Sequence, residues 1–299
     1  MSELTGLSIL IPIYNQDVRP LINQLLEQLS RLSIPAEIRC YDDGSDTAIK
    51  LLNQELRQNK SVVYMELPLN IGRSAIRNKL AQEAAYPQLL LLDGNVEITK
   101  KDFLETYIKQ ASQSPVLIGG SVYDYVPETA QSLRWKYGKS RESKPAVLRS
   151  AHPYRGITLK NILIRKEVYL QNPLDESIRT YGHEDTKFAY MLKEKKVTIL
   201  HIENPVRHIN LDNNEVFIGK TLDGVKNYYR LIREGYAGDS RLYDMYKIFR
   251  LFPFKQLFKS FYALLKLRID KNLRSGNPSL LYFDLMKLRA LLQEKESNA

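Results

Sequence analysis

Two adjacent carboxylates and a glycine stand in the stretch YDDGSD, Tyr41–Asp46, where a short apolar run ends. Neighbouring acids at the end of a buried strand repel each other and lose hydration, so their presence there needs an explanation. In one interpretation, Asp43 or Ser45 caps the following helix and Gly44 permits the turn. In another, Asp43 accepts a hydrogen bond from an N–H group of a nucleotide base, as acidic side chains do in other base contacts. The stretch alone favours capping, and the choice depends on the rest of the chain.

Two arginines and a third acid have types and spacing suited to a phosphate ligand. Arg73 and Arg77 lie one helical turn apart, and guanidinium groups bind phosphates through paired N–H donors. Asp93 ends an apolar run, where a carboxylate can hold a divalent cation that neutralises a diphosphate. The ordinary alternatives are surface ion pairs for the arginines and a helix cap for Asp93, and these residues alone leave both open.

The sequence lacks both common glycine-rich phosphate-binding motifs. PIYNQDVRP follows the first apolar run in place of GxGxxG, and GxxxxGK followed by Ser or Thr occurs nowhere. These absences argue against a dinucleotide-dependent dehydrogenase and against a P-loop enzyme. A nucleotide ligand would therefore be held by acids and arginines.

Alternating strands and helices must position these residues over the first hundred positions. The apolar runs predict strands at Leu7–Ile13, Ala36–Tyr41, Ser61–Leu67 and Gln88–Asp93, and helices at Pro20–Leu32, Thr47–Gln58 and Arg73–Ala85. Strands that are apolar on both faces and alternate with helices indicate a mostly parallel sheet with helices on both faces. Ligands of such sheets bind beyond the carboxyl ends of the strands, where Tyr14, Asp43 and Asp93 all lie. We therefore expect an α/β fold with its ligand at that edge.

The remainder of the chain is less regular until it becomes helical. The polar, basic stretch Tyr125–Tyr154 is expected to be a mobile loop or a long excursion. The elements expected around it are a helix at Asp102–Ser114, extended chain at Pro115–Tyr125, a strand and short helix at Lys160–Gln171, a helix at Glu184–Lys196 and a strand at Val197–Ile202. Helices follow beyond Asn213, with breaks near Gly235–Gly238, Pro253 and Gly276–Pro278. We therefore divide the chain into a catalytic domain, residues 1–212, and a helical, basic C-terminal region, residues 213–299.

Composition places the chain among ordinary globular proteins. Hydrophobic residues make up 43% of it and charged residues 26%, which is unlike a disordered chain. The single cysteine, Cys40, lies in an apolar run, so no disulfide framework exists and a reducing compartment is expected. We find no signal peptide, and no apolar stretch of the roughly 20 residues that a membrane-spanning helix needs. The expected location is the cytoplasm.

Positive charge gathers in the last fifth of the chain. From Arg241 onward, twelve Lys or Arg residues stand against five Asp or Glu residues, which accounts for about +7 of the net charge of +10. Aromatic residues and leucines recur among the lysines, a pattern that fits a helix lying on a membrane or packing on the catalytic domain better than a base-stacking groove. We therefore expect no nucleic-acid partner. Of the two remaining interpretations, we favour reversible attachment to the anionic inner face of the cytoplasmic membrane.

Five stretches, taken together and in order, resemble the successive motifs of family-2 inverting glycosyltransferases with the GT-A fold. They are SILIPIYNQ, YDDGSD, NIGRSAIRNKLAQEA, LLLLDGN and YGHEDTKFAYML, and the match covers roughly residues 7–211. GHED and the later NPVRH are similar to bacterial members that build surface and capsular polysaccharides. The resemblance implies transfer of a sugar from a nucleotide-sugar to a hydroxyl of a glycan or lipid-linked glycan acceptor. Members of the family commonly use UDP-sugars, so a UDP-sugar is the implied donor.

The resemblance also implies a role for each matching residue. Asp185, the second acid of the ED pair, is the implied general base, and Asp43 is the implied base-reading acid. A divalent cation, Mn²⁺ or Mg²⁺, is the implied cofactor, with Asp93, Asn95 and His208 as its ligands. The residues implied in nucleotide-sugar binding are Pro12, Tyr14, Asn15, Asp43, Arg73, Arg77, Asp93 and Glu184.

Position 95 departs from the family pattern, which usually has a second Asp there. Asn95 can ligate Mg²⁺ or Mn²⁺ through its amide oxygen, but it brings no charge, so metal affinity should weaken. The departure keeps open the alternative of a catalytically silent nucleotide-sugar-binding protein. A nucleotidyltransferase is a weaker alternative, because such an enzyme normally has a glycine-rich basic loop, which the sequence lacks.

Overall fold

The main sheet of the protein is mostly parallel, as the sequence predicts. The computed structural model describes residues 5–236 and 240–297, and within them seven strands form a sheet in the order β3-β2-β1-β4-β8-β6-β9. In this sheet β8 alone runs antiparallel to its neighbours. The strands are β1 (Leu7–Ile13), β2 (Ala36–Asp42), β3 (Val62–Glu66), β4 (Gln88–Leu92), β6 (Val116–Ile118), β8 (Asn161–Arg165) and β9 (Ile199–His201).

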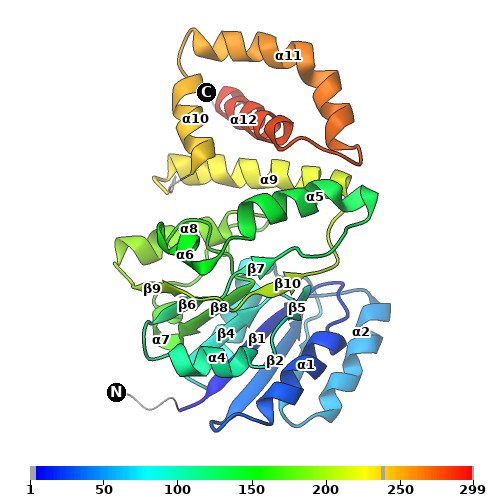
Figure 1. Ribbon diagram of the computed structural model, residues 1–299, viewed down its shortest axis with the longest axis vertical. Coiled ribbons are helices and arrows are strands. Elements are labelled where there is room, and N and C mark those ends of the chain that lie inside the picture. Colours follow the sequence, from blue (N-terminus) through cyan, green and yellow to red (C-terminus); the bar gives the residue numbers. More distant parts are fainter. Residues whose placement is uncertain (1–4, 237–239, 298–299) are drawn as a thin grey trace.

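Helices cover both faces of this sheet (Figure 1). Successive residues of a strand point to opposite faces, so Ile9 and Ile11 of β1 pack in a core with α1 and α4, whereas Leu10 packs in a second core with α3, α7 and α8. Cys40 is fully buried in the first of these cores. The helices on this part of the chain are α1 (Arg19–Leu29), α2 (Thr47–Asn53), α3 (Arg73–Glu83), α4 (Phe103–Gln110), α7 (Lys166–Leu170) and α8 (Glu184–Glu194), with a 3₁₀ turn at Gln54–Gln58.

Strand register brings the residues after β1 and β2 together. Ile13 lies opposite Asp42 in the parallel β1–β2 pair, so the segments that follow the two strands leave the sheet side by side. The backbone N–H of Asn15 then donates to Ser45 Oγ at 2.8 Å, and the N–H of Asp46 donates to Asn15 Oδ1 at 2.7 Å. Because parallel strands in register end at one edge of the sheet, the polar side chains that follow β1 and β2 lie close together there.

A second, three-stranded sheet places His208 beside Asn95. It consists of β5 (Val96–Ile98), β10 (Val206–His208) and β7 (Ser121–Val122), with β10 in the middle. In the antiparallel β10–β5 pair His208 lies opposite Val96. Pro115–Tyr125 is therefore not one extended element, because β6 and β7 belong to different sheets.

The stretch 125–154 is a long excursion with helices, the second of the two alternatives that the sequence leaves open. It contains a 3₁₀ turn (Thr129–Gln131), α5 (Ser132–Tyr137), a π-helical turn (Gly138–Glu142) and α6 (Ala146–Ser150). Leu133 of α5 is fully buried in a third core, which it shares with the C-terminal helices. Figure 1 shows α5 lying between the sheet and α9.

In the part of the C-terminal region that the structure describes, the chain forms four helices, as expected. They are α9 (Asn214–Arg233), α10 (Arg241–Phe249), α11 (Phe254–Leu273) and α12 (Leu280–Ser297). The breaks at Pro253 and Gly276–Pro278 lie between helices, and α9 ends just before Gly235, whereas Gly238 lies outside the described residues. The division at residue 212 stays a prediction, and the third core crosses it through α5. Among the described residues, no helix is both long enough and apolar enough to span a membrane.

Candidate active site

One cleft of about 2460 Å³ contains every site residue predicted from the sequence. Its floor lies at the carboxyl ends of β1, β2 and β4, and its walls come from α3, α8, the 125–154 excursion and α9. The structure thus brings the predicted residues together, while their individual roles remain predictions. They are Pro12, Tyr14, Asn15, Asp43, Arg73, Arg77, Asp93, Asn95, Glu184, Asp185 and His208.

The two acids of YDDGSD accept hydrogen bonds from two different backbone segments. Asp42 is buried, and its Oδ1 accepts the N–H of Ser45 at 2.7 Å, which fixes the turn. Asp43 accepts the N–H groups of Ile71 and Gly72 at 2.7 and 3.1 Å, so it holds the loop that begins α3. Burial raises the pKa of the Asp43 carboxyl, and the two N–H groups oppose that shift. Neither Asp43 nor Ser45 caps the following helix, so the capping interpretation is wrong: Asp46 stands at the N-cap position.

Gly44 is required at this turn. Its φ is +77°, in the left-handed region that favours glycine. A Cβ at this position would lie 2.7 Å from the backbone nitrogen of Asn70. The turn after β2 and the loop before α3 are therefore packed backbone against backbone, which gives Asp43 its fixed place at the cleft.

Arg77 and Asp93 form a buried ion pair at the base of the cleft. Both side chains are largely hidden from solvent, and Arg77 Nη2 donates to Asp93 Oδ1. Burial by itself would raise the pKa of Asp93, but the charges of Arg77, Arg73 and Lys160 outweigh it and bring this pKa to about 2. Asp93 is thus ionised at any working pH. The surface-pair alternative for Arg77 is wrong, because its side chain is buried.

The ED pair at the start of α8 contains two acids in different electrostatic states. Glu184 accepts a hydrogen bond from Arg73 Nε at 2.9 Å, and the charges of Arg73 and Arg77 overcome burial to lower its pKa. Burial, together with the nearby charge of Glu184, raises the pKa of Asp185 to about 7. A carboxylate with a pKa near neutrality can accept and release a proton efficiently. Of the pair, Asp185 therefore has the properties of a general base.

The loop that presents Asp185 rests on α9, a helix outside the site that the motifs predict. Asn227 Nδ2 donates to the carbonyl oxygen of Gly182 at 3.1 Å and to Thr180 Oγ1 at 3.0 Å. The ring of His183 stacks on Tyr228 with centroids 4.5 Å apart, and burial lowers the pKa of His183 to about 4. In the sequence, the signal of this contact is Gly224, a glycine inside a predicted helix. The backbone of the loop approaches it closely: a Cβ on Gly182, whose φ is +99°, would lie 3.2 Å from the Cα of Gly224.

Asn95 and His208 lie in direct contact at the cleft. Asn95 Nδ2 is 2.8 Å from His208 Nε2, and His208 Nδ1 is 2.8 Å from Tyr123 Oη. Burial and the charges of Lys160 and Arg134 lower the pKa of His208 well below its usual value, so the imidazole is neutral and can offer a lone pair.

The three predicted metal ligands have chemistry that fits a divalent cation. Asp93 supplies a carboxylate, His208 a neutral imidazole and Asn95 an amide oxygen, which are ligand types that Mn²⁺ accepts. Within the described residues, no group of three or more His, Cys, Asp and Glu side chains is placed to hold a metal ion. A cation here would therefore depend on the amide of Asn95, whose Nδ2 would have to move away from His208 Nε2 so that this nitrogen could bind the ion.

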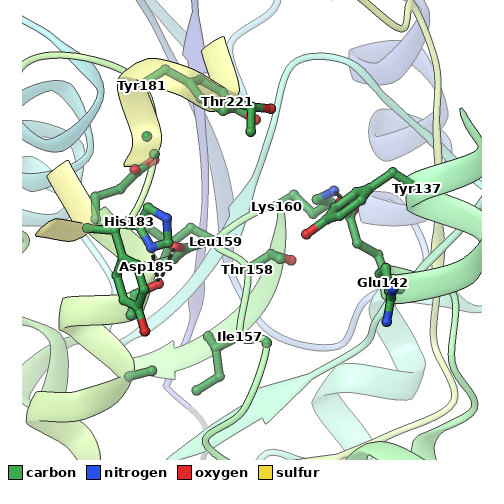
Figure 2. A pocket seen from close by; sticks show the side chains of 18 of the residues that line it. Tyr137, Glu142, Ile157, Thr158, Leu159, Lys160, Tyr181, His183, Asp185 and Thr221 are labelled. Carbon is green, nitrogen blue, oxygen red and sulfur yellow. Dashed lines mark hydrogen bonds and ion pairs between the residues drawn. The ribbon is translucent and has the colours of Figure 1, made fainter. Parts of the chain in front are cut away.

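A buried network opposite Asp185 also lies outside the site that the motifs predict. Glu142 accepts hydrogen bonds from Lys160 Nζ at 2.7 Å and from Tyr123 Oη at 2.5 Å, and it pairs with Arg134 at 3.0 Å. Burial would raise the pKa of Glu142, but these two cations hold it well below its usual value. Figure 2 shows Lys160 and Glu142 on one side of the pocket and Asp185 on the other. The excursion that carries Arg134 and Glu142 has no regular sequence pattern, so nothing local points to them.

Comparisons with known proteins agree with the motifs. Residues 8–169 match a family model described as Glycosyl transferase family 2. A curated relative, the poly(ribitol-phosphate) beta-glucosyltransferase of Bacillus spizizenii, is 32% identical over 119 residues. That match covers 38% of this chain and 18% of the relative, so the chain spans less than a fifth of the relative's length.

Two solved structures share the fold over nearly the whole chain. The S. aureus protein TarS, as a 1–349 fragment, has a TM-score of 0.51 at 17% identity, with 98% of this chain and 91% of that chain covered. The mannosyltransferase PcManGT from Pyrobaculum calidifontis, solved with GDP-Man and Mn²⁺, has a TM-score of 0.58 at 13% identity, with 98% and 86% covered. These similarities confirm the predicted GT-A fold with its helical C-terminal region. Because the family match covers more than half of the sequence, the chain belongs to glycosyl transferase family 2.

Proposed function

We propose that this protein is an inverting glycosyltransferase that uses a UDP-sugar and builds a bacterial surface polysaccharide. The acceptor would be a hydroxyl of a glycan or of a lipid-linked glycan at the cytoplasmic face of the membrane. The single observation that carries the proposal is the position of Asp185, with a pKa of about 7, in the same cleft as Arg73, Arg77 and Lys160. A related structure, the TarS fragment, was solved with UDP, and the curated relative is a glucosyltransferase. UDP-glucose is therefore the first donor to test.

Asp185 would act on the acceptor hydroxyl. Its carboxylate would take the hydroxyl proton while the oxygen attacks the anomeric carbon from the face opposite the leaving diphosphate, which inverts the configuration in one displacement. Glu184 cannot easily share this role, because Arg73 holds it as a paired anion. Glu184 instead raises the proton affinity of its neighbour and orients Arg73.

The leaving diphosphate would be stabilised by the cations of the cleft. Arg73 and Lys160 face the cleft, and preorganised cations lower the energy of charge that grows in the transition state. Asp93, Asn95 and His208 would hold a Mn²⁺ or Mg²⁺ ion, which when bound supplies further positive charge to the diphosphate. Arg77 would keep Asp93 ionised and in place.

The base would bind at the edge formed by the loops after β1 and β2. Tyr14 is more than half exposed there and offers a ring against which a base can stack. Pro12 and Asn15 line the same part of the cleft, and Asp43 retains lone pairs beyond those that hold Ile71 and Gly72. Asn15 is itself fixed through Asp46, so this edge is formed before any ligand binds.

A catalytically silent nucleotide-sugar-binding protein is the second candidate. One observation favours it: position 95 carries an amide that is hydrogen-bonded to His208, where the family usually has a charged ligand. Turnover and binding must therefore be measured on the same sample.

The test combines a donor screen with product analysis. Thermal shifts with a panel of nucleotide-sugars, with and without Mn²⁺, would select the donor. UDP release in the presence of ribitol-phosphate oligomers would then measure transfer, and NMR of the product would give the anomeric configuration. Donor binding without UDP release under all conditions would favour the silent binder, and retention of configuration would refute the inverting mechanism.

A further inference from the structure

Helices α10 and α11 lie at the end of the molecule farthest from the sheet (Figure 1). These helices and the turn between them expose several large apolar side chains. We call this set the apolar ridge and define it by Ile248, Phe252, Leu257, Phe261, Leu264 and Leu267. Phe252, Leu264 and Leu267 are each more than 80% exposed. Large apolar side chains that are exposed together in one part of a chain indicate an interaction site, whereas single exposed apolar residues do not.

The ridge is a second apolar face of α11, in addition to the face that packs in the core. Phe258, Tyr262 and Ile269 are buried in the third core. Leu257, Phe261 and Leu264 follow one another at spacings of four and three residues, so they share one side of the helix. Core packing therefore explains only one of the two apolar sides.

Cations without protein partners accompany the ridge. Arg250, Arg268 and Lys271 are exposed, and within the described residues their side chains form no ion pair. By contrast, Lys255 and Lys259 both pair with Glu296 of α12, each at 3.0 Å. Arg268 and Lys271 follow Leu264 by four and seven residues and therefore share its side of α11. Such a combination of cations and apolar side chains is typical of helices that lie in the interface of an anionic bilayer.

We propose that the apolar ridge docks the protein on an anionic membrane surface. Its apolar side chains enter the headgroup boundary, and Arg250, Arg268 and Lys271 contact the lipid phosphates. A second copy of the chain is a poorer occupant, because pairing two ridges would bring these cations against their equivalents. Docking does not depend on the proposed sugar transfer. If both proposals hold, the protein binds its acceptor at the membrane surface.

The ridge and the cleft are connected through α10. Leu242 and Met245 line the cleft, and Met245 lies one helical turn before Ile248 of the ridge. A membrane held at the ridge would therefore lie beside one end of the cleft. An acceptor whose lipid stays in the bilayer could then reach Asp185 without leaving the membrane.

Vesicle sedimentation of the full chain tests the proposal. Phosphatidylcholine vesicles with increasing phosphatidylglycerol would be used, at low and high salt. The charge variant Arg250→Gln/Arg268→Gln/Lys271→Gln should weaken binding by about a hundredfold, because each cation near an anionic surface contributes about fivefold. The control Arg31→Gln/Lys60→Gln/Lys101→Gln removes three exposed cations elsewhere and should lose at most a few-fold.

A second pair of variants tests the apolar contribution. Leu264→Gln/Leu267→Gln should lose binding, while Leu51→Gln/Val126→Gln, which changes two exposed apolar residues elsewhere, should not. The proposal is overturned if the wild type ignores anionic lipid, if ridge variants bind as the wild type does, or if controls lose as much. It is also overturned if sedimentation velocity shows a dimer that the Leu264→Gln/Leu267→Gln variant abolishes while no form binds vesicles.

UDP calorimetry on the same samples separates this inference from the proposed function. All four variants should bind UDP as the wild type does, since none of the changed residues lines the cleft. Normal UDP binding would also show that the variants are folded. A wild type that binds vesicles but not UDP would contradict the proposed function and leave the docking surface standing.

Discussion

The pH dependence of sugar transfer should report the pKa of Asp185 directly. A carboxyl with a pKa of about 7 is about nine-tenths ionised near pH 8 but only about one-thirtieth ionised near pH 5.5. If Asp185 is the base, the rate at saturating donor should fall about thirtyfold between these two pH values. With an ordinary aspartate pKa, the rate would hardly change over this range.

The neighbouring acid provides a way to move the midpoint. The charge of Glu184 raises the pKa of Asp185, and Glu184→Gln also frees Arg73 to interact with it. Both effects favour the ionised form, so the midpoint of the pH profile should shift to lower pH. Asp185→Asn should leave UDP binding nearly intact and reduce transfer by about a hundredfold or more.

Initial rates of UDP release, measured from about pH 5 to about pH 9 with one buffer series, provide the assay. Thermal melting provides a readout that is independent of activity. Because the folded-state pKa of Asp185 lies above its unfolded value, its contribution to stability is present at low pH and is lost as the pH rises through about 7. Asp185→Asn should therefore melt higher than the wild type near pH 8, but not near pH 5. A flat profile below pH 7 in the wild type, or near-normal turnover in Asp185→Asn, would remove Asp185 as the base.

Three further predictions concern other parts of the cleft. Asp43→Ala leaves the N–H groups of Ile71 and Gly72 without acceptors, so UDP affinity measured by calorimetry should fall by about 1–3 kcal/mol; unchanged affinity in a folded variant would contradict this. Asn227→Ala should lower kcat by about tenfold with little change in donor KM, because it loosens the loop that carries Asp185; an effect confined to donor KM would argue against positioning. Mn²⁺ should tighten UDP binding in the wild type but not in His208→Ala, and equal tightening in both would exclude His208 as a ligand.

The sequence alone predicts the part of the site that depends on strand order. Parallel strands end at one edge of a sheet, so the order of strands and helices is enough to place Asp43 and Asp93 together. Arg77 is placed near them by its helix, but its burial against Asp93 does not follow from a spacing that also fits a surface pair.

Residues that reach the cleft through tertiary packing cannot be predicted in this way. Glu142 lies in an irregular excursion, and its partners Arg134 and Lys160 are identified only once β8 and α5 are placed in space. Asn227 lies in a helix that the sequence pattern assigns to a separate region. Each of these contacts joins segments that no local periodicity connects.

The third core has a consequence for how the protein unfolds. Leu133 of α5 is buried there among residues of α9, α11 and α12, and α9 in turn supports the loop before α8 through Asn227. Separating the C-terminal helices would expose this core and release the loop at the same time. Denaturant should therefore unfold the sheet and the C-terminal helices in one cooperative transition rather than two, as expected of a single folding unit.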